Sequence, residues 1–234
     1  MKHEKNPNKR AFKIVTKKQV AITKPTDEPI PEIDTAKAVA FAMSIAQEMK
    51  QRQREADDGK RGTGEPPVKD NLVLIGMPGV GKSTAGVVAA KLAGYQFLDS
   101  DLVIMQRDGR LLREIIEQDG VEGFLSIENR VNASISTHNT IIATGGSVIF
   151  GDGAMHHLAS IGTIVYLRAS YETVASRVTD LKGRGVAMKP AQTLREIYEE
   201  RKDLYEKFAD HIIDVDEQSI EATAQELAKI ARNG

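Results

Sequence analysis

Residues 71–94 read NLVLIGMPGVGKSTAGVVAAKLAG, and this stretch decides the fold. Its first part, NLVLI, has the length and composition of a buried strand. A glycine-rich turn follows, and then an alanine-rich segment that favours a helix. The turn, residues 76–84, fits the pattern G-x-x-x-x-G-K-[ST] in the strand-to-helix context that this motif requires. The stretch therefore predicts a phosphate-binding loop between a strand and a helix.

The residues of this loop suit a nucleoside triphosphate. Glycines let backbone N–H groups wrap a phosphate without Cβ clashes, and the following helix directs its positive end at the same anion. Lys82 is expected to reach the β- and γ-phosphates, and the Ser83 hydroxyl is expected to ligate Mg2+. The predicted nucleotide-binding residues of the loop are Gly76, Gly79, Gly81, Lys82, Ser83 and Thr84.

Downstream of this loop, short apolar strands alternate with helical segments. The expected strands lie in NLVLIG, YQFLDSD, NTIIATGG, TIVYLR and HIIDV, and a helix follows each, the last ending near Ala231. Strands that alternate with helices imply right-handed crossovers and a parallel sheet covered on both faces. We therefore expect a three-layer α/β domain with a central parallel sheet over residues 71–234.

The first 70 residues differ in composition from the rest. Residues 1–24 carry a net charge of +7, whereas the remainder carries −8. A basic leader can contact nucleic acid or an acidic partner, although a solvated, disordered segment is the simpler interpretation. Apolar residues recur at helical spacing over about 33–54, which predicts an amphipathic helix that packs on the main domain or forms a dimer contact. Residues 56–70 have the composition of a linker.

The whole chain has the composition of a globular protein, with 234 residues, 41% hydrophobic and 28% charged. No run approaches the roughly 20 apolar residues that a membrane helix requires, and the first residues lack the apolar segment of a secretory signal. The absence of cysteine excludes disulfides and thiolate metal sites, and H-E-x-x-H spacing is absent too. We expect a cytoplasmic monomer or weak homodimer that acts on a small molecule, without membrane or nucleic acid partners.

Two carboxylates follow the second expected strand, in FLDSDLVI at residues 97–104. If the chain stayed extended there, Asp99 and Asp101 would lie on the same face, and such a pair needs a positive partner. Ligands bind beyond the carboxyl ends of parallel strands. One aspartate is therefore expected to serve Mg2+, and the other to orient an acceptor hydroxyl and accept its proton. The competing interpretation is that either aspartate caps the following helix.

Taken together, these motifs resemble the shikimate kinase family over about residues 71–230. The DSD of residues 99–101 looks like the family's D-[ST]-D, in which the first Asp serves the magnesium site and the second binds substrate hydroxyls. The resemblance implies a P-loop kinase fold with a lid loop. It also implies ATP- and Mg2+-dependent phosphorylation of an alcohol, with shikimate converted to 3-phosphoshikimate as the best single expectation.

The resemblance assigns further residues to the site. Residues 107–128 are similar to the family's substrate-binding stretch, with Phe124 and Glu128 in register. The TGG of residues 144–146 matches the strand end that meets substrate and γ-phosphate through its backbone. The resemblance implies that Arg177 contacts the adenine, that Arg184 closes the lid over the phosphates, and that Arg201 binds the substrate carboxylate. It also implies substrate contacts for Asp101, Gly145 and Gly146. The implied catalytic residues are Lys82, Asp101 and Arg184.

Three motifs depart from the family pattern. Leu125 stands where the family's F-R-x-x-E has the arginine that binds the shikimate carboxylate and pairs with the glutamate. Losing such a charge-assisted anchor costs roughly 1.5–3 kcal/mol unless another group, such as Arg113 or Arg130, replaces it. Ser147 replaces the third glycine of the family's GGG, and residues 184–187 read RGVA where the lid usually has R-P-L-L.

Three hypotheses follow from these matches and departures. The first is a shikimate kinase, and the second is a kinase of the same fold that phosphorylates a different small hydroxy acid or polyol. The third is a sensor that binds a ligand and signals through the N-terminal segment without turnover. Retention of the full catalytic set argues against the sensor, because a domain that only binds a ligand has no need of it.

Overall fold

A computed structural model describes residues 69–178, 185–189 and 191–233. The helix expected at about 33–54, most of the expected linker, and Arg184 lie outside the described residues. Within the described part of the chain, no helix is long and apolar enough to cross a membrane.

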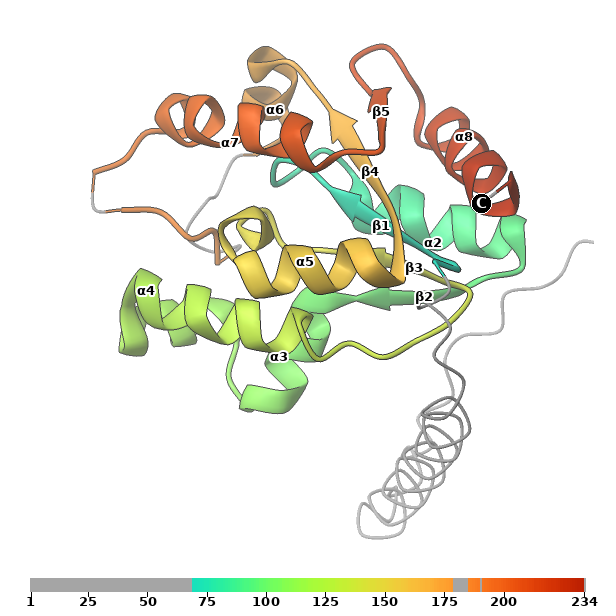
Figure 1. Ribbon diagram of the computed structural model, residues 1–234. Coiled ribbons are helices and arrows are strands. Elements are labelled where there is room, and N and C mark those ends of the chain that lie inside the picture. The colour runs from blue at the N-terminus through green and yellow to red at the C-terminus, as the bar shows by residue number, and fades with distance from the viewer. Residues whose placement is uncertain (1–68, 179–184, 190, 234) are drawn as a thin grey trace, which may run out of the picture. The chain divides into compact units, whose positions relative to one another are not determined.

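Five strands form one parallel sheet in the spatial order β2-β3-β1-β4-β5 (Figure 1). Strand β1 is central and pairs with β3 on one side and with β4 on the other. The edge strands β2 and β5 pair with β3 and β4, respectively. The strands are β1 (Asn71–Ile75), β2 (Gln96–Asp99), β3 (Thr140–Ala143), β4 (Gly162–Arg168) and β5 (His211–Asp214).

Helices cover both faces of this sheet, so the expectation of a three-layer α/β fold is confirmed. Helix α2 packs against α8 and against β1, β2 and β3, whereas α5 and α7 contact β4 and α4 packs on α5 (Figure 1). The helices are α2 (Lys82–Ala93), α3 (Ser100–Asp108), α4 (Leu112–Asn132), a 3-10 helix η1 (Val148–Phe150), α5 (Asp152–Ile161), α6 (Tyr171–Arg177), α7 (Leu194–Phe208) and α8 (Ile220–Asn233).

The sequence patterns explain why the core lies around β1. Every residue of NLVLI is buried, as expected for a central strand that is covered on both faces. Small residues of α2 let that helix approach the sheet closely: a Cβ on Gly86 would lie 2.9 Å from the Phe97 ring and 3.0 Å from Leu74. The apolar β1 and the alanine-rich α2 together place the loop between them at the carboxyl edge of the sheet.

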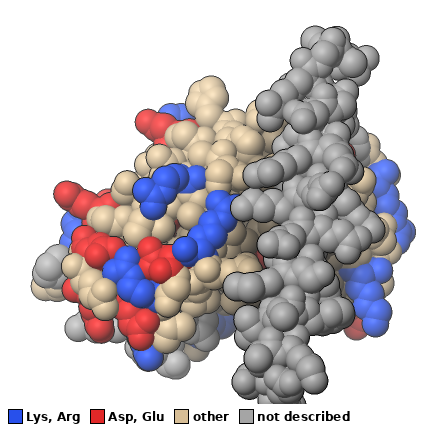
Figure 2. Space-filling view, turned by 90° about the horizontal axis from the view of Figure 1, so that it is seen from below, with Lys and Arg blue, Asp and Glu red and all other residues tan. Residues whose placement is uncertain are grey.

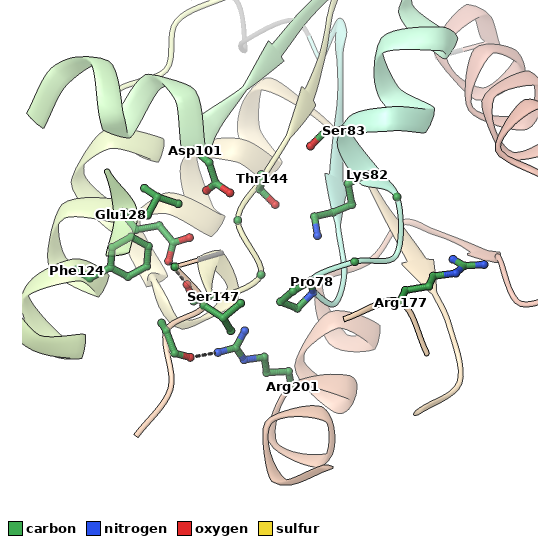
Figure 3. Close-up of a pocket in the computed structure, with 18 of the residues that line it drawn as sticks. Pro78, Lys82, Ser83, Asp101, Phe124, Glu128, Thr144, Ser147, Arg177 and Arg201 are labelled. Carbon is green, nitrogen blue, oxygen red and sulfur yellow. Dashed lines mark hydrogen bonds between the residues drawn. The ribbon is translucent and has the colours of Figure 1, made fainter. Parts of the chain in front are cut away.

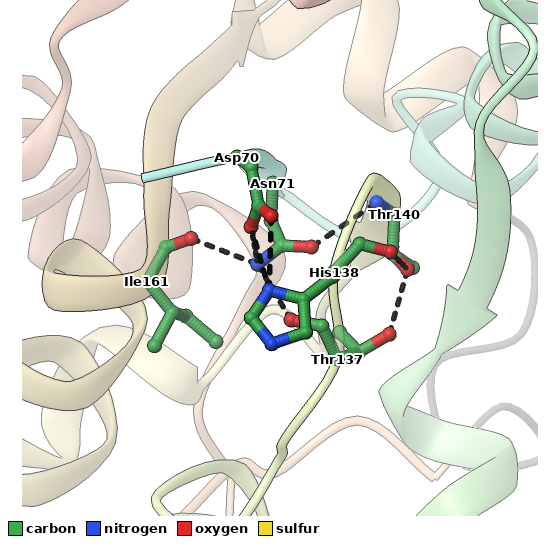
Figure 4. Close-up of polar contacts among 6 residues, drawn as sticks. All are labelled: Asp70, Asn71, Thr137, His138, Thr140 and Ile161. Carbon is green, nitrogen blue, oxygen red and sulfur yellow. Dashed lines mark hydrogen bonds and ion pairs between the residues drawn. The ribbon is translucent and has the colours of Figure 1, made fainter. Parts of the chain in front are cut away.

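A polar network closes the opposite edge of the sheet. The buried Asn71 side chain donates to the carbonyl oxygens of Thr137, at 2.9 Å, and Ile161, at 2.8 Å (Figure 4). It also accepts a hydrogen bond from the backbone N–H of Thr140. Nearby, Nδ1 of His138 lies 2.9 Å from the Asp70 carboxylate. These bonds join the starts of β1, β3 and β4 at the edge remote from the phosphate-binding loop.

The structure differs from the sequence expectation just after β2. The strand ends at Asp99 and α3 begins at Ser100, so Asp101 is helical and does not share an extended face with Asp99. The reason is local, because the Asp99 carboxylate accepts the Asp101 backbone N–H at 3.0 Å and caps the helix. The prediction of a single helix after this strand is also wrong. Helix α3 is terminated by its C-cap residue Gly109, which adopts φ 83°, and α4 follows as a second helix.

Charges of both signs are intermixed on the surface of the domain. On the left of Figure 2, acidic and basic side chains lie side by side. Arg110 is an example, since it forms ion pairs with Asp108 at 2.5 Å and with Asp119 at 2.7 Å. Such exposed pairs contribute little to stability, typically less than about 1 kcal/mol each.

Candidate active site

A cavity of about 480 Å3 opens at the carboxyl edge of the sheet (Figure 3). It is lined by the loop after β1, the start of α3, the middle of α4, the loop after β3, residues 185–187 and α7. Five of the six nucleotide-binding residues predicted in the phosphate-binding loop line it, and Gly76 does not. Elements that lie up to 123 residues apart in the sequence, from Pro78 to Arg201, therefore meet around one cavity.

Gly76 lets the backbone turn at the start of the phosphate-binding loop. Its φ is 142°, and a Cβ there would lie 2.6 Å from the Leu167 carbonyl oxygen of β4. Only glycine fits a backbone that approaches its neighbour so closely with this φ. The position predicted as nucleotide-binding thus serves to turn the chain out of β1.

Lys82 points into the cavity from the first residue of α2 (Figure 3). Its ammonium group donates to the carbonyl oxygens of Gly76, at 2.8 Å, and Met77, at 3.0 Å. Burial lowers the pKa of Lys82 to about 8, although the negative charges of Asp101 and Asp99 oppose that shift. A buried ammonium beside two carboxylates is ready to exchange its carbonyl partners for phosphate oxygens.

Asp99 links the phosphate-binding loop to α3. One carboxylate oxygen caps α3, and the other accepts the hydroxyl hydrogen of Ser83 at 2.6 Å. Of the two interpretations that the sequence left open for Asp99, the helix cap is confirmed, and the magnesium site stays a prediction. Ser83 and Asp99 bring two oxygen atoms together at the edge of the cavity.

Asp101 projects into the cavity from the first turn of α3 (Figure 3). Its Oδ1 atom is buried and has no hydrogen-bond partner among the described residues. Burial raises the pKa of Asp101 to about 6, the neighbouring charge of Asp99 adds to the shift, and Lys82 opposes it. A buried carboxylate oxygen without a partner is costly, so this position is suited to a hydroxyl group supplied by a ligand.

The loop after β3 forms the floor of the cavity with almost no side chains. Thr144 is tied to β1 through its hydroxyl, which donates to the Leu74 carbonyl at 2.8 Å. The Tyr205 hydroxyl donates to the Gly146 carbonyl at 2.5 Å and fixes the other end of the loop. A Cβ on Gly145 would meet Glu128 Oε1 at 2.3 Å and Asp101 Oδ1 at 2.8 Å. Glycine at this position therefore lets both carboxyl groups lie against the loop.

Arg201 supplies a buried cation on the side opposite Asp101 (Figure 3). The residue is 2% exposed, and its Nη2 atom donates to the Ala187 carbonyl at 2.5 Å. In the part of the chain that the structure describes, its buried Nε and Nη1 atoms have no hydrogen-bond partner. The start of α7 is fixed by Thr193 and Glu196, which bond each other's backbone N–H groups in a capping box. A buried guanidinium group with unpaired donors is suited to an anionic oxygen supplied by a ligand.

Arg177 lines the cavity at its other end, beyond the phosphate-binding loop from Asp101 (Figure 3). It belongs to the last turn of α6, and its guanidinium lies 3.5 Å from the Val80 carbonyl and 3.4 Å from the Val215 carbonyl. The adenine contact that the resemblance implies for Arg177 stays a prediction.

Leu125 lies on a different face of α4 from the residues that line the main cavity. Phe124 and Glu128, which are four residues apart, lie on one face of the helix and line the cavity. Leu125 is partly buried in an apolar cluster and lines two neighbouring cavities instead. Arg113 lies in one of these neighbouring cavities and Arg130 is exposed, so neither occupies the main cavity.

A contact that the sequence analysis missed joins Glu128 to Ser147. The Ser147 hydroxyl donates to Glu128 Oε2 at 2.6 Å, and both side chains are buried. Burial raises the pKa of Glu128 to about 8, against the opposing hydrogen bond from Ser147. The two residues were each singled out by sequence, Glu128 as a match and Ser147 as a departure. Their contact depends on how α4 packs on the loop after β3, which no local pattern shows.

The chain is similar to known proteins over this whole domain. A sequence profile described as shikimate kinase matches residues 78–232. The shikimate kinase of Thiobacillus denitrificans is 36% identical over 155 residues, which cover 65% of this chain and 85% of that protein. The shikimate kinase of Histophilus somni is 33% identical over 169 residues, covering 70% of this chain and 97% of that protein.

The solved structures agree with the sequence comparison. Shikimate kinase from Acinetobacter baumannii, in a complex with shikimate, matches with a TM-score of 0.64 and 30% identity, covering 70% of this chain and 93% of that one. Shikimate kinase from Aquifex aeolicus matches with a TM-score of 0.57 and 26% identity, over 70% and 96% of the two chains. The chain belongs to the shikimate kinase family.

Proposed function

We propose that the protein transfers the γ-phosphoryl group of ATP to a hydroxyl group of shikimate, giving 3-phosphoshikimate, with Mg2+ as cofactor. The observation that carries this proposal is the set of groups facing one cavity: the Lys82 ammonium, the unpaired Asp101 Oδ1 and the unpaired donors of Arg201. Lys82 suits the phosphates, Asp101 suits a hydroxyl group and Arg201 suits a carboxylate. The cavity therefore suits a hydroxy acid as the acceptor.

Asp101 orients the acceptor hydroxyl and takes up its proton. The hydroxyl oxygen forms a bond to the γ-phosphorus, the bond from that phosphorus to the β–γ bridging oxygen breaks, and ADP leaves with the electron pair. Lys82 stabilises the negative charge on the phosphate oxygens as this exchange proceeds. The protein thus contributes mainly position and charge, both of which its cavity supplies.

The residues present fit a magnesium ion. Mg2+ prefers oxygen ligands and keeps several of its own waters, so one or two protein oxygens are sufficient. Ser83 Oγ and Asp99 Oδ2, which lie 2.6 Å apart beside the loop, would hold it. When bound, Mg2+ neutralises charge on the β- and γ-phosphate oxygens.

The acceptor end of the cavity differs from the family pattern because Leu125 replaces an arginine. Among the described residues that line this end, Arg201 is the cation aimed at an acceptor carboxylate. A kinase of the same fold that phosphorylates another hydroxy acid or a polyol is therefore the second candidate. Leu125 favours it, because a site with fewer cations binds a carboxylate less tightly.

The variant Leu125→Arg distinguishes the two candidates. Leu125 lines a cavity that Arg201 also borders, so a longer guanidinium side chain would lie beside Arg201. We expect its KM for shikimate to fall about tenfold while the KM for uncharged polyols stays unchanged. Steady-state ATP turnover with shikimate, quinate, small hydroxy acids and polyols measures this. Faster turnover of another acceptor by the unmodified chain would favour the second candidate, and tight binding without turnover of any acceptor would favour a sensor.

The variant Gly145→Ala tests the position of the acceptor. The added Cβ would lie 2.3 Å from Glu128 Oε1 and 2.8 Å from Asp101 Oδ1, so it would displace the carboxyl group that the proposal assigns to the acceptor hydroxyl. Overpacking of this kind costs about 1–3 kcal/mol, so we expect the KM for shikimate to rise about tenfold to a hundredfold. The dissociation constant of ATP, measured by calorimetry, is expected to stay within twofold.

Gly153→Ala is the matched control for that substitution. Gly153 lies in α5 outside the cavity, and an added Cβ there meets Asn129 at 3.3 Å. The control is expected to leave the KM for shikimate unchanged. An unaltered KM in Gly145→Ala would contradict the contact between Asp101 and the acceptor.

A further inference from the structure

A second, smaller cavity borders Arg201, and we call it the side cavity. Its volume is about 180 Å3. Its apolar wall combines α4, η1 and the segment before α7, through Val121, Leu125, Phe150 and Met188. None of these four residues lines the main cavity. The side cavity is therefore a separate space with its own lining, and the proposed phosphoryl transfer leaves it unused.

The guanidinium group of Arg201 lies between the two cavities. Its central carbon is 5.4 Å from the centre of the Phe150 ring, which lines the side cavity. Towards the main cavity, Nη1 is 3.2 Å from the position that a Cβ of Gly146 would take. Nη2 donates to the carbonyl oxygen of Ala187, a residue that borders both cavities (Figure 3). A ligand in the side cavity can therefore reach the same cation as an acceptor in the main cavity.

Among the described polar side chains of this lining, Arg201 is the one with buried, unpaired donors. These donors are Nε and Nη1, on a residue that is 2% exposed. The other polar side chains bond to one another, because Glu200 accepts from Gln192 at 2.7 Å and from Lys189 at 3.3 Å. Unpaired donors of a buried guanidinium are costly unless a ligand supplies an anionic oxygen. A matching ligand of the side cavity is therefore an anion.

The apolar wall determines what the rest of that ligand is. Leu125 stands where the family pattern has an arginine, so the wall carries no charge at this position. Hydroxyl groups placed against Leu125, Val121 and Met188 would lose their water without gaining hydrogen bonds, whereas hydrocarbon is stabilised by the same burial. The volume of about 180 Å3 limits the hydrocarbon to a short chain or a single ring. The side cavity therefore suits a small apolar acid and disfavours a polyhydroxy acid.

We propose that the side cavity binds a small monocarboxylic acid with an apolar body, as its carboxylate, and that this ligand inhibits the protein by occupying Arg201. The carboxylate accepts hydrogen bonds from the unpaired guanidinium donors, and the hydrocarbon packs against the apolar wall. Two carboxylates close to one guanidinium repel each other, so this ligand and an acidic acceptor exclude one another. Binding of the acid is independent of the proposed kinase function, whereas the competition with the acceptor rests on it.

Hexanoate is the probe of this site, and steady-state ATP turnover with shikimate measures its effect. We expect hexanoate to raise the apparent KM for shikimate and to leave kcat unchanged. Acetate has the same charge without the apolar body, and hexan-1-ol has a similar body without the charge. Each of these two compounds is expected to inhibit at least about tenfold more weakly than hexanoate. Equal inhibition by the three compounds, a lower kcat at saturating shikimate, or no inhibition by hexanoate would overturn the inference.

The variant Val121→Asp tests whether hexanoate lies in the side cavity, because Val121 lines that cavity and not the main one. The new carboxylate repels hexanoate and makes the wall polar, so the inhibition constant of hexanoate is expected to rise at least about tenfold. Ile116→Asp is the matched control on the same helix. Ile116 is also partly buried but lines only the neighbouring larger cavity, so its inhibition constant is expected to stay within twofold. Equal inhibition constants in the two folded variants would contradict the assigned position.

Saturation-transfer NMR of the unmodified full chain separates this inference from the proposed function, because it detects bound hexanoate without turnover. We expect a hexanoate signal that shikimate suppresses and that hexan-1-ol at the same concentration does not give. Hexanoate binding in a protein that turns over no acceptor would support the site and overturn the kinase function. Turnover of shikimate without hexanoate binding would overturn this inference and leave the kinase function standing.

Discussion

Replacing Lys82 with methionine is expected to lower kcat by about a hundredfold to a thousandfold. The ammonium group lies at the start of α2, faces the cavity and is held by the carbonyl oxygens of Gly76 and Met77. Removing one positive group that stabilises charge in a transition state typically has an effect of this size. Methionine keeps an unbranched apolar stem and removes only the charge. Single-turnover measurements with saturating ATP and shikimate give the rate of the chemical step.

Lys91→Met is the matched control, because Lys91 lies on the same helix and is exposed. It is expected to keep kcat within twofold. Both variants are expected to fold, since removal of the buried charge of Lys82 also removes its desolvation cost. If a folded Lys82→Met protein retained more than a tenth of the activity, Lys82 would not be the group that stabilises the transferred phosphoryl.

Replacing Asp101 with asparagine is expected to lower kcat by about 10²- to 10⁴-fold, with a much smaller change in KM. Asparagine can still accept a hydrogen bond from the acceptor hydroxyl, but it cannot take up the proton. The expected loss is the usual contribution of a positioned general base. A loss in kcat without a matching rise in KM is the feature that separates proton transfer from simple binding.

Asp203→Asn provides the control on a neighbouring, exposed position of α7. It is expected to be fully active. Equal loss in kcat and gain in KM for Asp101→Asn would instead assign Asp101 to acceptor binding alone. Unchanged kinetics would remove Asp101 from the site.

The sequence predicted the fold and the strand–turn–helix of the phosphate-binding loop well. The strand–turn–helix around residues 76–84 is a local motif, and its residue types predict its backbone geometry. It can therefore be recognised from the sequence without the structure. The alternation of strands and helices predicted the parallel sheet for the same reason. Asp99 and Asp101 were correctly brought to the carboxyl edge of the sheet, although their shared extended face was wrong. The helix cap by Asp99 decided that point, and it was present in the sequence as the weaker alternative.

The acceptor end depends on packing between distant segments and was less predictable. Leu125 was recognised as a departure, but its place in a neighbouring cavity follows from the orientation of α4, which breaks at Gly120 with φ 74°. Helical spacing is the signal that was available, because Phe124 and Glu128 are four residues apart while Leu125 points elsewhere. The contact between Glu128 and Ser147 spans 19 residues and needs the loop after β3 to meet α4. No local pattern specifies such a contact.

The central claim is that this cavity transfers a phosphoryl group from ATP to shikimate. The most direct measurement is ³¹P NMR of a mixture of the full chain, ATP, Mg2+ and shikimate. We predict that the γ-phosphate signal of ATP disappears while signals of ADP and of a phosphate monoester grow in equal amounts, and that the Lys82→Met protein forms neither at a comparable rate. Formation of ADP with inorganic phosphate, or no consumption of ATP in the presence of shikimate, would contradict the claim.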